Sequence, residues 1–213
     1  MARSDAFIFL DDVQFSKNGY TNRTRILTSG QPRWLTIPVS YGFGDSICDV
    51  TASDAGWKSK HLDTLGNTYR SALYFRDTRA KISELLDSLP RENLAVINQR
   101  LVEGIARLLE IDCRLYASSN IPIGKQSGDE RLISLVRSID GATEYLSGRG
   151  GANYQDESKF FDAGISLRYN DFSLPQYPQS SEVFTPGLSV IDAAFHLGWT
   201  GTAKLLSKLV PFA

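Results

Sequence analysis

The chain has 213 residues, of which 42% are hydrophobic, and its 23 basic and 24 acidic residues give a net charge of −1. A chain of this length can bury a sizeable core, and we expect one α/β domain over residues 1–213, with residues 54–111 as a candidate helical sub-lobe. The balanced charge argues against a partner such as nucleic acid or an anionic membrane surface.

The two cysteines, Cys48 and Cys113, lie far apart and form neither metal-ligand spacing nor a disulfide framework. We interpret them as small core residues of a protein in a reducing compartment. No stretch approaches the roughly 18 apolar residues of a membrane span, and the first residues lack the apolar core of a signal peptide. A cytoplasmic protein is therefore expected.

The N-terminal part is predicted to form short strands. Phe7–Leu10 is a continuous apolar run, typical of a strand buried on both faces, and it ends abruptly in Asp11-Asp12. Ser16–Thr24 contains Gly19 and two asparagines, so we expect a loop or the irregular start of a helix. After a turn signal at residues 29–32, two further strands are predicted at Arg33–Ser40 and Ser46–Val50.

The middle of the chain is predicted to be helical. One helix contains Trp57–Tyr69, and a second covers Asp77–Leu89 and ends before Pro90. Asn93 is a preferred N-cap residue for a third helix. That helix has the clearest apolar stripe of the chain, at positions 94, 97, 101, 105 and 108.

In the last hundred residues, strands alternate with helices. The predicted strands are Arg114–Ala117, Thr143–Leu146 and Ile165–Tyr169, and the predicted helices are Glu130–Ile139, Ser158–Ala163, Ser189–Leu197 and Thr202–Leu209. This alternation favours a layered α/β fold with a largely parallel sheet and a helical insertion or lobe in the middle of the chain.

Asp11 and Asp12 stand at the carboxyl end of the first predicted strand, the edge where ligands bind in open parallel sheets. A carboxylate at that edge can orient an amine or a hydroxyl, bind a metal or act as a base. The alternative is a solvated turn in which one aspartate caps a loop amide.

Cationic and amide side chains follow in the same stretch. Lys17, Arg23 and Arg25 supply cations that can hold a carboxylate or a phosphate, and Gln14 and Asn22 add neutral donors and acceptors. The alternative is an exposed polar loop in which Arg23 pairs with Asp11 or Asp12.

A glycine-rich segment follows the strand predicted at Thr143–Leu146. It comprises Ser147, Gly148, Arg149, Gly150 and Gly151, with Tyr154 after it. Glycines let the backbone approach a ligand, and successive N–H groups can cradle an anion. The segment is neither a Walker A loop nor a dinucleotide fingerprint, and a tight strand-to-helix connection is the alternative.

Three titratable groups remain. His61, on the helix containing Trp57, is a candidate general base, although a lone histidine among apolar neighbours is more often structural. His196 lies in an apolar run and is interpreted as structural. Asp192 lies inside an apolar helix, so its carboxylate must find partners, such as a cation of the first loop, or face a cleft.

Several of these stretches together resemble the WbqC-like family over nearly the whole chain. The matching pieces are FIFLDDVQFSKNGYTNRTRI, WLTIPV, WKSKHLDTL with NTYRSALYF, EYLSGRGGANY and LSVIDAAFHLG. By position, the resemblance marks as typical residues Asp11, Asp12, Gln14, Asn22, Arg23, Gly148, Gly151, Tyr154 and Asp192. It implies a bacterial protein from a gene cluster for O-antigen or another surface glycan.

One departure from the family pattern concerns the start of the chain. Family members usually begin with an apolar strand and a motif like QPxYxPWxGYF, about twenty residues before the block that matches DDVQF here. That segment is missing, and we hypothesise that Met1 is an internal methionine of a longer frame or that the chain was truncated. This usual segment, followed by a strand that ends in Asp-Asp, resembles the N-terminal part of nucleotide-binding Rossmann-like transferases. A Rossmann-like sheet is therefore expected by analogy.

The resulting expectation is a transferase of surface-polysaccharide biosynthesis that acts on an amino-sugar or a nucleotide-linked sugar, without a metal and with no cofactor named. The expected catalytic residues are Asp11, Asp12 and His61, and the expected substrate-binding residues are Gln14, Lys17, Asn22, Arg23, Ser147, Gly148, Gly150, Gly151, Tyr154 and Asp192. The alternative is a non-catalytic ligand-binding or scaffold protein of a glycan-assembly complex, and either protein could form homo-oligomers or bind a pathway partner.

Overall fold

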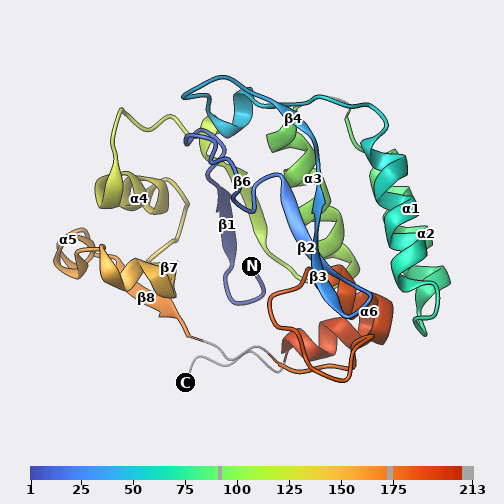
Figure 1. Ribbon diagram of the computed structural model, residues 1–213. Coiled ribbons are helices and arrows are strands. Elements are labelled where there is room, and N and C mark those ends of the chain that lie inside the picture. Colours follow the sequence, from blue (N-terminus) through green and yellow to red (C-terminus); the bar gives the residue numbers. More distant parts are fainter. Residues whose placement is uncertain (91–92, 172–174, 208–213) are drawn as a thin grey trace. The chain divides into compact units, whose positions relative to one another are not determined.

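The computed structural model describes residues 1–90, 93–171 and 175–207, and its contacts divide the chain into two compact units (Figure 1). The smaller unit contains residues 3–10 and 113–171. The larger unit contains residues 11–112 and 175–207. Each unit is a mixture of helices and short strands.

The smaller unit is built from two parallel strand pairs and two helices. Strand β1 (Ala6–Phe9) pairs with β6 (Arg114–Ala117), and β7 (Glu144–Gly148) pairs with β8 (Ser166–Asn170). Helix α4 (Gly128–Arg137) lies between β6 and β7 in the chain, and α5 (Glu157–Asp162) lies between β7 and β8. The predicted mixed α/β class with parallel strands is thereby confirmed.

The core of the smaller unit forms around Phe160, which is fully buried in α5. Its ring stacks on that of Tyr145 in β7, with the ring centroids 5.7 Å apart. Ile133 and Val136 of α4 and Ile165 complete the buried cluster. The cluster thus joins both helices to the β7–β8 pair.

The larger unit combines antiparallel hairpins with helices. Strands β2 (Arg23–Thr28) and β3 (Gln31–Thr36) form one hairpin, β4 (Val39–Ser40) and β5 (Thr51–Ala52) form a short pair, and a 3-10 helix, η1, covers Ile47–Asp49. The helices are α1 (Trp57–Tyr69), α2 (Phe75–Asp87), α3 (Leu94–Leu108) and α6 (Val190–Ser207), and α6 is kinked at Gly198.

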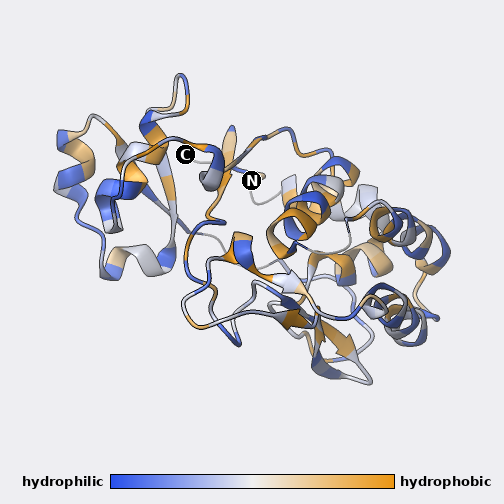
Figure 2. Cartoon of the chain, turned by 90° about the horizontal axis from the view of Figure 1, so that it is seen from above, coloured by the Kyte–Doolittle hydropathy of each residue, from blue (hydrophilic) through white to orange (hydrophobic). Residues whose placement is uncertain are grey.

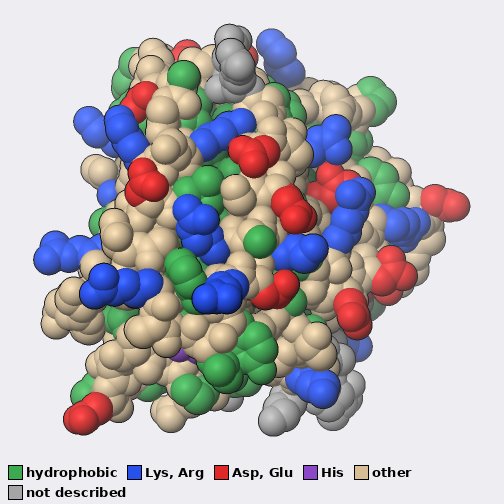
Figure 3. Space-filling view, turned by 90° about the vertical axis from the view of Figure 1, so that its right-hand side faces the viewer, with side chains coloured by type: hydrophobic (Ala, Val, Ile, Leu, Met, Phe, Trp, Pro, Cys, Tyr) green, Lys and Arg blue, Asp and Glu red, His purple; other side chains and the backbone are tan. Residues whose placement is uncertain are grey.

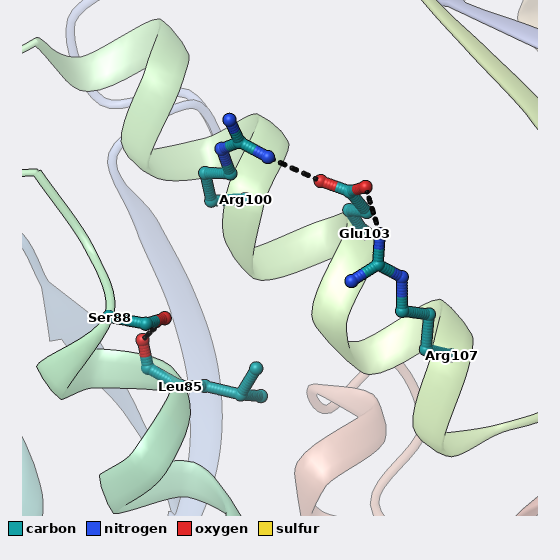
Figure 4. A network of polar contacts seen from close by, with 5 residues as sticks. All are labelled: Leu85, Ser88, Arg100, Glu103 and Arg107. Atoms are coloured by element: carbon teal, nitrogen blue, oxygen red, sulfur yellow. Dashed lines mark hydrogen bonds and ion pairs between the residues drawn. The ribbon is translucent and has the colours of Figure 1, made fainter.

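Helix α3 shows how the sequence pattern produces an element. The Asn93 side chain accepts a hydrogen bond from the Val96 amide at 3.0 Å, which caps the helix as predicted. The apolar side of α3 is buried, while Arg100, Glu103 and Arg107 form an ion-pair ladder along its outer side (Figure 4). Figure 2 shows the same division between hydrophobic and hydrophilic sides on helices of this unit.

The core of the larger unit centres on stacked aromatic rings. Tyr69 of α1 stacks on Phe195 of α6 with the centroids 4.2 Å apart, and Trp57, at the other end of α1, is buried in the same cluster. The Thr78 hydroxyl of α2 donates to the Ala194 carbonyl at 3.0 Å, which ties α2 to α6.

On the face that Figure 3 shows, basic and acidic side chains are interspersed over the surface.

Three predictions about local structure were wrong. The strand β2 was not predicted, because Ser16–Thr24 was interpreted as a loop and the residues after it were assigned to no element. Ser46–Val50 is not a strand but contains the 3-10 helix Ile47–Asp49. Phe7–Leu10 is not buried on both faces, since β1 is only half-buried and Leu10 is exposed.

Other observations concern the cysteines, the sheets and the membrane. Cys48 and Cys113 are free thiols, and both are half-buried rather than core residues. The described strands form four separate two-stranded sheets. Among the described residues, no helix combines the length and the apolar character needed to cross a membrane.

Candidate functional site

The Asp11 carboxylate follows β1 in the chain and is held by the larger unit. Only 6% of the residue is exposed, and the Gln99 side-chain amide of α3 donates to its Oδ2 at 3.1 Å. The loop that carries it is fixed by backbone hydrogen bonds, from the Cys48 amide to the Asp11 carbonyl at 2.7 Å and from the Ile47 amide to the Val13 carbonyl at 3.0 Å. A nearly buried carboxylate on a fixed loop is well suited to orient a ligand.

Negative charge is concentrated around this loop. Burial is the largest cause that raises the pKa of the Cys48 thiol, and the carboxylates of Asp49, Asp11 and Asp12 raise this pKa further. The thiol therefore stays protonated at neutral pH and is a poor nucleophile. The aspartates, rather than the cysteine, are the reactive candidates at this position.

Arg23 is held by its own loop and by an aromatic ring. Its Nε donates to the Gly19 carbonyl at 3.2 Å, its Nη2 donates to the Asn18 carbonyl, and its guanidinium lies 4.0 Å from the centroid of the Trp34 ring. Among the described residues it pairs with no carboxylate, so the ion pair with Asp11 or Asp12 considered from the sequence is not formed. Its geometry is that of a preorganised cation.

The other predicted residues of this loop differ in their surroundings. The Asn22 side chain donates to the Ile37 carbonyl at 2.9 Å, and the Ile37 amide donates to the Asn22 carbonyl at 2.8 Å, so Asn22 prolongs the β2–β3 ladder. Gln14 forms a β-bridge with Ser46, and its side chain is exposed. Lys17 is exposed, and its ammonium has no hydrogen-bond or ion-pair partner in the part of the chain that the structure describes.

His61 connects α1 to β3. Its Nε2 lies 2.9 Å from the Thr36 carbonyl oxygen and therefore carries the hydrogen, and its ring packs edge-to-face on Trp57 at 5.0 Å. Burial lowers the pKa of His61, against a smaller opposing effect of the Thr36 hydrogen bond, so the imidazole is neutral at pH 7. Thr36 is the strand partner of Arg23, which places His61 at the same end of the hairpin as Arg23.

Helix α3 links this end of the hairpin to Asp11. The Asn98 side chain donates to the Thr21 carbonyl at 2.7 Å, while its neighbour Gln99 donates to Asp11. Two consecutive residues of α3 therefore hold both the Asp11 loop and the loop before Arg23. That Asp11, Arg23 and His61 share one binding site stays a prediction.

Asp192 is fully buried in α6 and is bound by two tyrosines. The Tyr69 hydroxyl donates to its Oδ2 at 2.7 Å, and the Tyr177 hydroxyl donates to its Oδ1 at 2.8 Å. Burial and, to a smaller extent, the Asp192 charge raise the pKa values of Tyr69 and Tyr177 well above the usual tyrosine value. Both hydroxyls therefore remain hydrogen-bond donors at neutral pH. The side chain contacts no cation of the first loop among the described residues.

The glycine-rich segment lies in the smaller unit. Gly148 ends β7, and a 3-10 helix, η3 (Arg149–Asn153), follows it. A Cβ atom at Gly151 would collide with the Ser147 hydroxyl and with the Gln155 side chain, so a larger residue requires these side chains to move. This is the tight connection considered as the alternative, although the space at Gly150 is open and Tyr154 is exposed. That the residues of this segment bind substrate stays a prediction.

Sequence reasoning missed the partners that hold the predicted residues. Gln99, Tyr69 and Tyr177 had no distinguishing pattern, because their roles arise from the packing of α1, α3 and α6. Trp34 was interpreted only as a strand residue. Its contact with Arg23 could not be foreseen, because β2 was not predicted and its pairing with β3 was therefore unknown.

The fold and site define a mixed α/β protein with a nearly buried carboxylate after its first strand. The WbqC-like protein family matches residues 1–204, and the chain therefore belongs to this family, which is associated with polysaccharide biosynthesis. The chain is also 30% identical over 197 residues to the uncharacterized protein Rv1507c of Mycobacterium tuberculosis, a match that covers 91% of this chain and 84% of the relative. No solved structure matches the chain.

Proposed function

We propose that the protein is a cytoplasmic transferase of bacterial surface-polysaccharide biosynthesis, of the O-antigen type, that acts on an amino-sugar or a nucleotide-linked sugar. The observation that carries the proposal is the Asp11 carboxylate, only 6% exposed and held by Gln99, in a member of a family associated with polysaccharide biosynthesis. A fixed, poorly solvated carboxylate is suited to accept a proton from an attacking amine or hydroxyl.

Each predicted residue has a role in this proposal. Asp11 orients and deprotonates the nucleophile, Asp12 adds negative charge beside it, and the neutral His61 is a second candidate base. In the larger unit, the substrate is bound by Gln14, Lys17, Asn22 and Arg23. In the smaller unit, the proposed substrate-binding residues are Ser147, Gly148, Gly150, Gly151 and Tyr154. Asp192 acts indirectly, since its carboxylate is enclosed by two tyrosine hydroxyls and it positions α6.

The proposal includes one WbqC-like domain over residues 1–213 with a layered, Rossmann-like sheet and a helical lobe at residues 54–111. The chain order β6–α4–β7–α5–β8 and the parallel β1–β6 and β7–β8 pairs support such a sheet. The three helices α1, α2 and α3 support the lobe.

The test combines a ligand screen with one substitution. Nucleotide sugars, acyl-CoA and aminoacyl donors are first screened by thermal shift, where a ligand at 100 times its Kd stabilises the protein by about 2.7 kcal/mol. Each hit is then incubated with amino-sugar acceptors, and products are detected by mass spectrometry. We expect Asp11→Asn to lower turnover by at least about 100-fold with an unchanged melting temperature.

Asp49→Asn is the matched control, because Asp49 lies in the same negative cluster but is exposed. It should leave turnover within about twofold of the wild type, as is usual for an exposed residue without a role in the reaction. Equal turnover by Asp11→Asn and the wild type would contradict the proposed role of Asp11. Binding of a sugar ligand without any product would instead favour the non-catalytic alternative.

A further inference from the structure

The larger unit exposes two aromatic side chains beside Arg23. Tyr20 is 66% exposed and Trp34 is 43% exposed, and their rings meet edge-to-face with the centroids 5.2 Å apart. The other two tryptophans, Trp57 and Trp199, are buried. Because an aromatic ring gains from leaving water, an exposed aromatic pair of this size marks a binding surface when polar groups are fixed around it.

Arg23 is the fixed polar group of this surface. Its Nε and Nη2 donate to backbone carbonyls, and its guanidinium lies over the Trp34 ring. Its Nη1 has no acceptor among the described residues, and the guanidinium has no carboxylate partner there. The side chain is thus held in place while its Nη1 donor and its positive charge remain available to an anionic group.

The register of the hairpin places these groups on one face. Arg23 lies opposite Thr36 and Arg25 lies opposite Trp34, so these four residues share a face of the β2–β3 pair. Arg33 precedes Trp34 and therefore points to the other face. This alternation provides a matched control on the same strand.

The segment of the chain that carries this surface is rich in basic residues. Between Asp12 and Asp45 the sequence contains four basic residues, Lys17, Arg23, Arg25 and Arg33, and no acidic residue, although the whole chain has a net charge of −1. Arg25 donates to the carbonyls of Pro186 and Gly187 at 3.1 and 3.2 Å. An anionic ligand complements this segment of the chain.

We propose that Tyr20, Trp34 and Arg23 bind a sugar ring that carries a phosphate or carboxylate group. The apolar C–H face of the sugar packs against the exposed parts of the Tyr20 and Trp34 rings, and the Arg23 guanidinium donates from Nη1 to the anionic oxygen. The proposal rests on the proposed function for its ligand class, and it adds Trp34 and Tyr20 as residues that select a charged sugar over a neutral one.

The test uses Trp34 as its own reporter. Trp34 is the exposed tryptophan of the chain, so acrylamide quenching of tryptophan emission reports mainly on it. We expect glucose 1-phosphate and glucuronate to protect the emission from quenching in a saturable manner. Glucose should bind at least about tenfold more weakly, since it lacks the group that pairs with Arg23.

Four variants, read by the thermal-shift affinity for glucose 1-phosphate, locate the site. Trp34→Ala and Arg23→Lys should each weaken binding about tenfold, the second because the ammonium lacks the planar fork. Arg33→Gln on the opposite face and the exposed Phe43→Ala should leave binding unchanged. Melting temperatures without ligand show whether each variant remains folded.

The outcomes separate this inference from the proposed function. Binding that is unchanged in Trp34→Ala, or protection by uridine diphosphate equal to that by glucose 1-phosphate, overturns the sugar-ring assignment. Absence of protection by every charged sugar overturns it as well. Protection that depends on Trp34 in a protein with no transfer activity supports the inference while contradicting the transferase.

Discussion

The buried carboxylate of Asp192 shows how single residues fix the packing of the larger unit. A carboxylate removed from water is costly unless its oxygens accept hydrogen bonds, and here each oxygen accepts one from a tyrosine. The Tyr69 ring also stacks on Phe195, so the same side chain contributes apolar contact and a polar donor. Removing only the hydroxyl separates the two contributions.

We predict that Tyr69→Phe lowers the free energy of unfolding by about 1.5–3 kcal/mol, because it removes a hydrogen bond to a charged group and leaves one buried carboxylate oxygen with one donor fewer. The measurement is urea denaturation followed by circular dichroism. Tyr154→Phe is the control, since Tyr154 is exposed, and it should change stability by less than about 0.5 kcal/mol. An equal effect of the two substitutions would contradict the role of the hydroxyl.

The stabilisation that the Tyr69–Asp192 hydrogen bond provides depends on pH. Burial and the nearby Asp192 raise the pKa of Tyr69 in the folded state above its value of about 10 in the unfolded state. The contribution to stability is therefore complete below pH 10, and it is lost at higher pH as the unfolded tyrosine ionises. The stability advantage of the wild type over Tyr69→Phe should shrink by about 1.4 kcal/mol per pH unit above pH 10.

At the residue scale, the sequence reveals which groups need partners but not which partners they find. Asp192 was identified because a carboxylate in an apolar helix cannot remain unpaired. Its partner Tyr69 lies 123 positions away in the sequence, and only the packing of α1 against α6 brings the two together. The same holds for Asp11 and Gln99, which are 88 positions apart.

At the scale of elements, helices were predicted best because their signals are local. Trp57–Tyr69 matches α1, and the Asn93 cap with its apolar stripe matches α3. The strand β2 escaped prediction because its sequence, RTRILT, has no alternation of apolar and polar residues. Its strand character comes from pairing with β3 through the turn at Ser29 and Gly30, both of which have positive φ angles.

The bend of α6 is located at Gly198. We predict that Gly198→Ala lowers the free energy of unfolding of the larger unit by about 1–3 kcal/mol. The residue has a φ of 70° and a ψ of 172°, which a side chain disfavours, and an added Cβ would lie 2.8 Å from Cδ1 of Tyr74. Thermal and urea unfolding of the variant measure the loss.

Gly66→Ala is the matched substitution in α1. An added Cβ there meets its nearest atom, Nε of Arg79, at an ordinary 3.5 Å, and the position lies within a regular helix. It should stabilise the protein by about 0.5–1 kcal/mol, because alanine is the better helix former. If both alanine variants change stability in the same direction, backbone strain at Gly198 is not the cause.

At the scale of the whole molecule, each unit has its own cluster of buried apolar residues. The cluster of the larger unit extends over α1, α2, α3 and α6. Among the described residues, that of the smaller unit has four buried members, around Phe160. Since stability grows with the apolar area removed from water, the smaller cluster should be the more sensitive of the two to a single truncation.

We predict that Phe160→Ala unfolds the smaller unit while the larger unit keeps its structure. Truncating a buried phenylalanine costs about 3–5 kcal/mol, and this substitution also removes the stacking on Tyr145. Hydrogen exchange should show lost protection in residues 113–171. Because Trp34, Trp57 and Trp199 all lie in the larger unit, tryptophan emission should remain that of the native protein.

The neighbouring Phe161 supplies the control, because it belongs to the same helix but is 82% exposed. Phe161→Ala should change stability by less than about 0.5 kcal/mol and leave exchange unaltered. If Phe160→Ala instead shifts tryptophan emission to that of the unfolded chain, the two clusters unfold as one cooperative unit. That result would favour the single domain expected from the sequence, since one truncation would then remove the structure of both units together.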